Sequence, residues 1–115
     1  MSFEVRTERV GTATVVAFAG ELDIASEAPA TAALEAAMSD GGILVADLRD
    51  LTFVDSTGVR VLLVAHLHAH KRGMRFGVAR ADGMVQKLLH VTRIDQRFPV
   101  VDDPAELMED ASPAA

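Results

Sequence analysis

The segment V-D-S-T-G, residues 54–58, brings an acid, two hydroxyls and a glycine together between two apolar runs. Three kinds of chemistry suit these residue types: nucleophilic attack by Ser56, capping of a helix, and covalent modification of the Ser56 hydroxyl. A phosphate on Ser56 would add about −1.5 to −2 charge where a helix start offers free N–H groups. The helix end attracts this charge and Asp55 repels it by a similar amount. We therefore expect phosphorylation to alter partner binding more than the fold.

Hydrolase chemistry is disfavoured by the residues around Ser56. The nucleophile elbow of hydrolases has the pattern G-x-S-x-G, and Val54 occupies its first glycine position. The histidines at 66, 68 and 70 follow two or more helical turns later, so no base on the same helix reaches the hydroxyl. We predict no catalytic residue. The plainest alternative remains that Ser56 only caps a helix that begins at Thr57 or Gly58, worth about 1 kcal/mol.

The segment HLHAH, residues 66–70, raises the possibility of a metal site because His66 and His70 share a helical face. A third ligand with suitable local spacing is missing from the sequence, and a metal site needs three or four. We expect these rings to border the packed face, with His68 on the opposite arc, and we predict neither a metal nor a cofactor. The chain also lacks both glycine-rich phosphate-binding motifs, so it resembles the substrate of a kinase rather than an ATP binder.

A strand and a helix must hold the 54–58 segment, and the pattern along the chain predicts which ones. Residues 3–7 alternate in polarity, Gly11 allows a turn, and the apolar run 13–19 predicts a central strand that pairs antiparallel with the first. A helix capped by Ser26 and ended by Gly41 and Gly42 is expected next. A short interior strand over Ile43–Leu48 precedes the helix 58–72, which Gly73 ends.

The last third of the chain predicts three further elements after a strand in residues 74–79. Asp82 is expected to cap a short helix. Pro99 removes one backbone donor from the next strand, so we expect Pro99 to lie either in an edge strand or at the start of its strand. Asp103, Pro104 and Glu106 together form the sequence signature of a helix start. The expected fold is α/β in the order β β α β α β α β α, a mixed sheet with an N-terminal hairpin and parallel strands after it. We expect a single domain over 1–110 and a flexible C-terminal tail at 111–115.

Composition narrows the function classes. The chain has 115 residues, a formal net charge of −6 and no cysteine. The negative charge disfavours direct nucleic-acid binding, and the absence of cysteine fits a reducing, cytoplasmic setting. The longest apolar run is far below the ~18 residues that cross a bilayer, so we expect no membrane insertion. The oligomeric state stays open.

Two stretches resemble one protein family. They are GELD at 20–23 and LVADLRDLTFVDSTGVRVLL at 44–63, and with the order of elements they are similar to the STAS domains of bacterial anti-sigma factor antagonists. The resemblance covers roughly Val5 to Met108. It implies a STAS-like domain that regulates transcription by binding another protein.

The resemblance also implies residue roles. In that family the serine after the Asp, here Ser56, is phosphorylated by a serine kinase that is itself the anti-sigma factor, and a serine phosphatase reverses this. The unphosphorylated protein captures the anti-sigma factor and frees the sigma factor. The residues implied in partner binding are Asp23, Asp55, Ser56, Thr57, Gly58 and Arg60. A rival expectation keeps the fold without the phosphate switch, as a STAS scaffold or an accessory subunit of a transport system.

Overall fold

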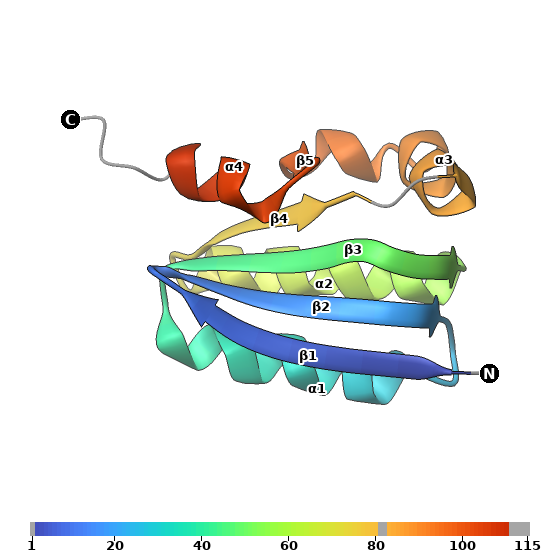
Figure 1. Cartoon of the computed structure of the whole chain (residues 1–115), viewed down its shortest axis with the longest axis horizontal. Helices are drawn as coiled ribbons and strands as arrows, with labels where there is room; N and C mark the ends of the chain where they lie inside the picture. Colours follow the sequence, from blue (N-terminus) through green and yellow to red (C-terminus); the bar gives the residue numbers. More distant parts are fainter. Residues whose placement is uncertain (1, 81–82, 111–115) are drawn as a thin grey trace.

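The computed structural model describes residues 2–80 and 83–110, which form one mixed sheet with helices packed on it (Figure 1). The strands lie in the order β1-β2-β3-β4-β5; β1 is antiparallel to β2, and the other neighbours are parallel. Their bounds are β1 Phe3–Val10, β2 Ala13–Leu22, β3 Ile43–Val54, β4 Arg75–Ala79 and β5 Val100–Val101. The helices are α1 Glu27–Ala37, α2 Ser56–Lys71, α3 Gly83–Val91 and α4 Pro104–Asp110, with 3₁₀ turns at Met38–Asp40 and Ile94–Gln96. The predicted order of strands and helices and the N-terminal hairpin are confirmed.

The predicted end of β3 at Leu48 is wrong, because the strand continues to Val54. Arg49 and Asp50 interrupt the apolar pattern and are exposed, but the chain passes them without leaving the sheet. Its register against β2 shifts twice, so β3 accommodates extra residues as bulges. The added length brings β3 to the same edge of the sheet as the end of β2, where the Asp55 N–H donates to the Leu22 carbonyl at 3.3 Å.

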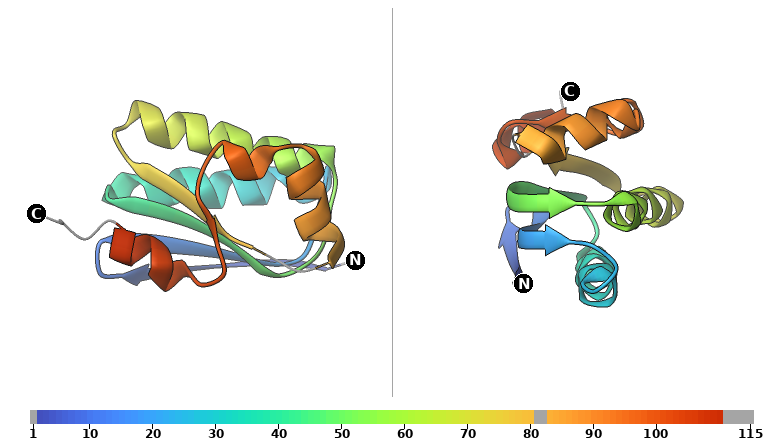
Figure 2. Two further views of the ribbon diagram at one scale, coloured as in Figure 1. Left: turned by 90° about the horizontal axis from the view of Figure 1, so that it is seen from above. Right: turned by 90° about the vertical axis from the view of Figure 1, so that its right-hand side faces the viewer.

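Helices α1 and α2 cover one face of the sheet, and α4 lies against the other (Figure 2). The main core fills the space between the sheet, α1, α2 and α3, and its largest fully buried side chains include Phe18, Leu22, Leu34, Leu44, Leu48, Leu62 and Leu89. A smaller cluster on the opposite face packs Leu107 of α4 on β2 and β3. The helices therefore cover most of one face of the sheet, and α4 covers only part of the other.

Three local predictions have different outcomes. Ser26 precedes α1 as expected, but its hydroxyl makes no helix-capping bond and instead donates to the Glu21 carbonyl at 2.8 Å. Of the alternating residues in β1, Phe3 and Val5 are half-buried, whereas Thr7 is exposed because the sheet edge there is uncovered. Gly73 ends α2 at a φ of 72°.

The C-terminal elements follow their sequence signals. The Asp103 carboxylate accepts from the Ala105 N–H, and Glu106 reaches back to the Asp103 N–H at 2.9 Å, which completes the expected cap of α4. Pro99 directly precedes β5 at the sheet edge. The predictions for Asp82 and for the tail 111–115 lie outside the described residues.

His66 borders the packed face, as expected, with its ring 6.0 Å from that of Phe76 and 5.4 Å from that of Phe98. Burial first, and then the positive charge of His70 and Arg97, lower the pKa of His66 below its ordinary value of 6.5. The unfolded chain therefore binds this proton at a higher pH than the folded chain does, and the free energy of unfolding falls as the pH drops below about 6.5.

Replacing His66 with Phe should flatten this dependence, because the new ring keeps the aromatic contacts and cannot take up a proton. Between about pH 7.5 and about pH 5.5 the melting temperature of the wild type should fall by a few degrees more than that of His66→Phe. Thermal melts monitored by circular dichroism at both pH values measure the difference. Equal falls in the two proteins would show that His66 does not control acid stability.

Candidate functional site at the start of α2

The cap of α2 is Asp55, not Ser56. Asp55 has an extended backbone, and its carboxylate accepts a hydrogen bond from the Gly58 N–H at 3.1 Å. Its carbonyl accepts the first helical bond, from the Val59 N–H at 3.0 Å. The predicted helix start at Thr57 or Gly58 is therefore wrong, because α2 begins at Ser56 itself, and Ser56 lies beside the cap rather than forming it.

The consequence is that the Ser56 hydroxyl has no structural task. Ser56 is exposed, and within the described chain its hydroxyl makes no hydrogen bond. It is the first residue of a 16-residue helix, next to a carboxylate that already satisfies one helix-end N–H. A partner or an enzyme can reach this oxygen without opening the fold. Thr57, beside it, is half-buried.

Gly58 is buried because α2 starts in close contact with the ends of β2 and β3. A Cβ at this position would lie 2.6 Å from the Leu22 carbonyl oxygen and 2.5 Å from a methyl carbon of Val54. Both distances are far below van der Waals contact, so only glycine fits here without a shift of the backbone. The glycine thus fixes where α2 begins, and with it the position of Ser56.

Asp23 shapes the neighbouring loop, between β2 and α1. Its carboxylate accepts hydrogen bonds from the Ala25 and Ser26 N–H groups at 3.0 and 3.3 Å. The pairing of Leu22 with Val54 places the ends of β2 and β3 side by side, so this loop and the start of α2 lie at the same edge of the sheet. Asp23 is half-buried and adds a second carboxylate to the edge that carries Asp55 and Ser56.

Arg60 lies four residues after Ser56, on the same face of α2, and is exposed. Its guanidinium is 3.6 Å from the Glu27 carboxylate of α1, so an ion pair across the two helices holds it. His68 also contacts α1: its Nδ1 is 2.6 Å from the Glu35 carboxylate. The side of α2 that carries Arg60 and His68 therefore faces α1 as well as solvent.

Two exposed apolar residues at this edge were not predicted from the sequence. Ile24, directly after Asp23, is 76% exposed, and Met84, in the first turn of α3, is 60% exposed. Each lies at or just beyond a loop that follows a parallel strand, β2 for Ile24 and β4 for Met84. A protein-binding surface generally has apolar contact area surrounded by a polar rim. Ile24 is a single large apolar residue in a loop and Met84 lies beside Val85 in α3, so no periodic pattern indicated that either side chain is exposed.

The histidines of α2 lie far from Ser56 along the helix. His66 is ten residues along α2 from Ser56, about 15 Å at 1.5 Å per residue, and its ring packs against Phe76 and Phe98. In the described part of the chain no group of three His, Asp or Glu residues is placed to share a metal ion. None of its helices is long and apolar enough to cross a membrane.

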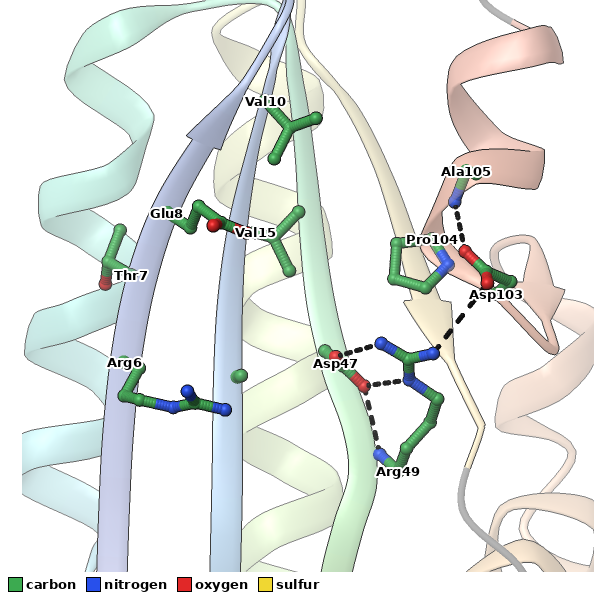
Figure 3. Close-up of a pocket in the computed structure, with 11 residues that line it drawn as sticks. Arg6, Thr7, Glu8, Val10, Val15, Asp47, Arg49, Asp103, Pro104 and Ala105 are labelled. Atoms are coloured by element: carbon green, nitrogen blue, oxygen red, sulfur yellow. Dashed lines mark hydrogen bonds and ion pairs between the residues drawn. The ribbon is translucent and has the colours of Figure 1, made fainter.

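A hollow of about 520 Å³ lies elsewhere, on the face of the sheet away from α2 (Figure 3). Its walls include Arg6, Asp47 and Arg49, and none of the predicted site residues lines it. Asp47 accepts from the Arg49 guanidinium at 3.0 and 2.9 Å and from the Arg49 N–H at 3.1 Å. This bond, with the charge of Asp47 and Asp103, raises the pKa of Arg49. The Asp47 carboxylate in the hollow is thus paired with its neighbour Arg49.

Comparisons with known proteins agree with the fold. The family model described as "Mlab, STAS domain" matches residues 5–102. An anti-sigma factor antagonist from Mycobacterium paratuberculosis is similar in structure, with a TM-score of 0.85 and 26% identity over 96% of this chain and 94% of that one. The anti-sigma factor antagonist SpoIIAA in its unphosphorylated form has a TM-score of 0.71 and 19% sequence identity, over 97% of this chain and 100% of that one.

A transport-related protein has the same fold. A sulfate transporter family protein from Wolinella succinogenes gives a TM-score of 0.74 and 13% identity over 89% of this chain and 86% of that one. A search among curated protein sequences found no match.

Proposed function

Because the chain belongs to the STAS domain family, we propose that it is an anti-sigma factor antagonist that phosphorylation of Ser56 switches off. The observation that carries this proposal is the state of the Ser56 hydroxyl: it is exposed at the start of α2 and bonded to nothing in the described chain, because Asp55 performs the capping. A serine that a kinase modifies must be reachable, and its loss from the hydrogen-bond network must cost little. Ser56 meets both conditions.

In its unphosphorylated form the protein docks an anti-sigma factor on the edge formed by the starts of α1, α2 and α3. Ile24 and Met84 supply apolar contact area, and Asp23, Asp55 and Arg60 supply charge around it. Capture of the anti-sigma factor frees the sigma factor for transcription in the cytoplasm. The protein acts by binding and is not itself an enzyme.

Phosphorylation changes this surface without refolding it. A phosphate on Ser56 places about −1.5 to −2 charge beside the carboxylates of Asp23 and Asp55. A partner that covers α2 would have to desolvate that charge, and each 1.4 kcal/mol lost weakens binding about tenfold. Arg60 is one turn away, but Glu27 already holds it. The anti-sigma factor is the serine kinase that adds the phosphate, and a serine phosphatase removes it.

Transfer of phosphate to Ser56 tests the proposal directly. Incubation with ATP and a serine-kinase anti-sigma factor from the same genome should add one phosphate, seen as a mass increase of about 80 Da. Ser56→Ala should stay unmodified, whereas Thr57→Ala, the matched loss of the neighbouring hydroxyl, should be modified like the wild type. Equal labelling of wild type and Ser56→Ala would exclude Ser56 as the acceptor.

A second candidate is a STAS scaffold or an accessory subunit of a transport system, without a phosphate switch. The likeness to a sulfate transporter family protein favours it. Affinity purification from the native cell separates the two candidates: recovery of a transport protein in place of a sigma-factor regulator, with Ser56 unmodified, would favour the transport role.

A further inference from the structure

The two edges of the sheet differ in how open they are to another strand. β5 has two residues and follows Pro99, so little backbone is available there. β1 has eight residues and no Pro, Gly or Lys, and its register against β2 runs without a shift. Glu4 and all residues of β1 from 6 to 10 are exposed, whereas Phe3 and Val5 are half-buried. Of the devices that protect an edge strand from pairing, β1 therefore lacks proline, a bulge and short length, and it retains only charged side chains.

The backbone of β1 offers hydrogen-bonding groups on its outer side. The Glu21 N–H donates to the Ser2 carbonyl at 3.1 Å, which makes Ser2 and Glu21 a hydrogen-bonded pair of the antiparallel ladder. Hydrogen-bonded and non-bonded pairs alternate, so residues 4, 6, 8 and 10 bond to β2. Phe3, Val5 and Thr7 then direct their N–H and C=O groups outward, away from β2.

The side chains of β1 carry a charge pattern that complements itself. Glu4, Arg6 and Glu8 share one face of the strand, and Figure 3 shows Arg6 and Glu8 on the same side, with Thr7 on the other. All three charged residues are exposed, and within the described chain none of them forms a hydrogen bond or an ion pair. Alternating signs at a spacing of two residues can be matched by a second strand that runs antiparallel.

We propose that β1 is a self-association surface through which a second copy of this chain extends the sheet, with Thr7 opposite Thr7 on a two-fold axis. The outward groups of Thr7 then bond to those of the second Thr7. In the adjacent non-bonded positions each Arg6 faces Glu8 of the second copy, with Cβ atoms about 4.5–5.5 Å apart. Residues 4–10 of both strands take part.

Other registers are worse. The second strand can slip by two residues and still pair its outward groups. This slip sets Arg6 opposite Arg6, or Glu8 opposite Glu8. Like charges directly opposite each other are destabilising. A slip by four residues sets Glu4 opposite Arg6 but pairs only residues 3–7. The register centred on Thr7 combines opposite charges with the longer overlap.

The helix beside this edge leaves room for a second copy. α1 packs next to β1, and its two charged residues, Glu27 and Glu35, form ion pairs with α2. Its exposed residues are Ala28, Pro29, Ala32 and Ala36, all small and uncharged. A two-fold axis normal to the sheet brings the two α1 helices to the same side, where small residues permit close approach. Ser56 stays at the far ends, so a dimer would present two partner-binding edges.

Charge exchange on β1 tests the pairing. Sedimentation velocity from about 10 µM to about 1 mM should show a dimer that Arg6→Glu weakens at least tenfold, since both pairs become like-charged. Glu8→Arg should weaken it as much, although it makes the chain less negative. The double variant with both changes restores opposite charges and should dimerise like the wild type. Circular dichroism verifies that each variant is folded.

Glu4→Arg is the matched control for register. In the proposed register Glu4 faces Val10 of the second copy, so the dimer should change less than twofold; loss of the dimer on Glu4→Arg but not on Glu8→Arg would overturn the register. Thr7→Cys adds the single cysteine of the chain, with Cα atoms about 5.5 Å apart across the axis. It should form a disulfide dimer on mild oxidation, and Glu4→Cys should not.

Two results would overturn the proposal outright. The first is a wild type that stays monomeric up to about 1 mM, with Thr7→Cys no faster to cross-link than Glu4→Cys. The second is a dimer that neither Arg6→Glu nor Glu8→Arg weakens, which would place the interface elsewhere.

Discussion

Replacing Ser56 with Asp should weaken binding of the anti-sigma factor at least tenfold while the melting temperature stays within about 2 °C of the wild type. The exposed hydroxyl makes no bond that Asp would break, so the fold loses nothing. The new carboxylate also lies in the first turn of α2, where negative charge is favourable. A bound partner must desolvate the added charge beside Asp23 and Asp55, and binding is therefore weaker. Isothermal titration calorimetry and thermal melts measure the two effects separately.

Two variants make this result interpretable. Ser56→Ala should bind within about twofold of the wild type, because it adds no charge. Asp55→Ala should lower the free energy of unfolding by about 1 kcal/mol, since it removes the bond to the Gly58 N–H that caps α2. Ser56→Asp that bound as tightly as the wild type would place the docking surface away from this edge. A large loss of stability in Ser56→Ala would show that the hydroxyl is structural after all.

The order of strands and helices was predictable because most elements carry local signals. Alternation in β1, the apolar run of β2, Gly73 after α2 and the cap of α4 are properties of a few neighbouring residues. The length of β3 was not predictable in this way. Arg49 and Asp50 break its pattern, and only pairing with β2 through two bulges carries the strand to Val54. Tertiary pairing, which a local pattern does not contain, overrides the polar interruption.

The candidate site was proposed from the sequence, but the roles of the residues within it were not predicted. Asp and Ser are both good caps, so residues 55 and 56 could exchange roles on local grounds. The choice is made by a distant residue: the Leu22 carbonyl accepts from the Asp55 N–H and holds Asp55 at the end of β3. The ion pair of Arg60 with Glu27 and the exposure of Ile24 and Met84 likewise depend on how α1 and α3 pack, for which the sequence holds no periodic signal.

Gly58→Ala should lower the free energy of unfolding by roughly 2 kcal/mol and the melting temperature by roughly 10 °C. In an open helix this change stabilises by up to about 1 kcal/mol, so the sign depends on the space around the new methyl group. That space is occupied: the Cβ would lie 2.6 Å from the Leu22 carbonyl oxygen, a backbone atom held by its bond to Asp55. The start of α2 must therefore move, which also lengthens the capping bond from the Gly58 N–H.

Pairing this change with Val54→Ala separates the close contact from a general helix effect. Val54 supplies the other close atom, a methyl carbon that would lie 2.5 Å from the new Cβ. Its removal relieves part of the overlap, so the double variant should be more stable than the sum of the single effects predicts, by at least about 0.5 kcal/mol. Urea unfolding of the four proteins measures this coupling. Additive losses, or a Gly58→Ala protein as stable as the wild type, would show that α2 can start without this contact and that Ser56 is not positioned by it.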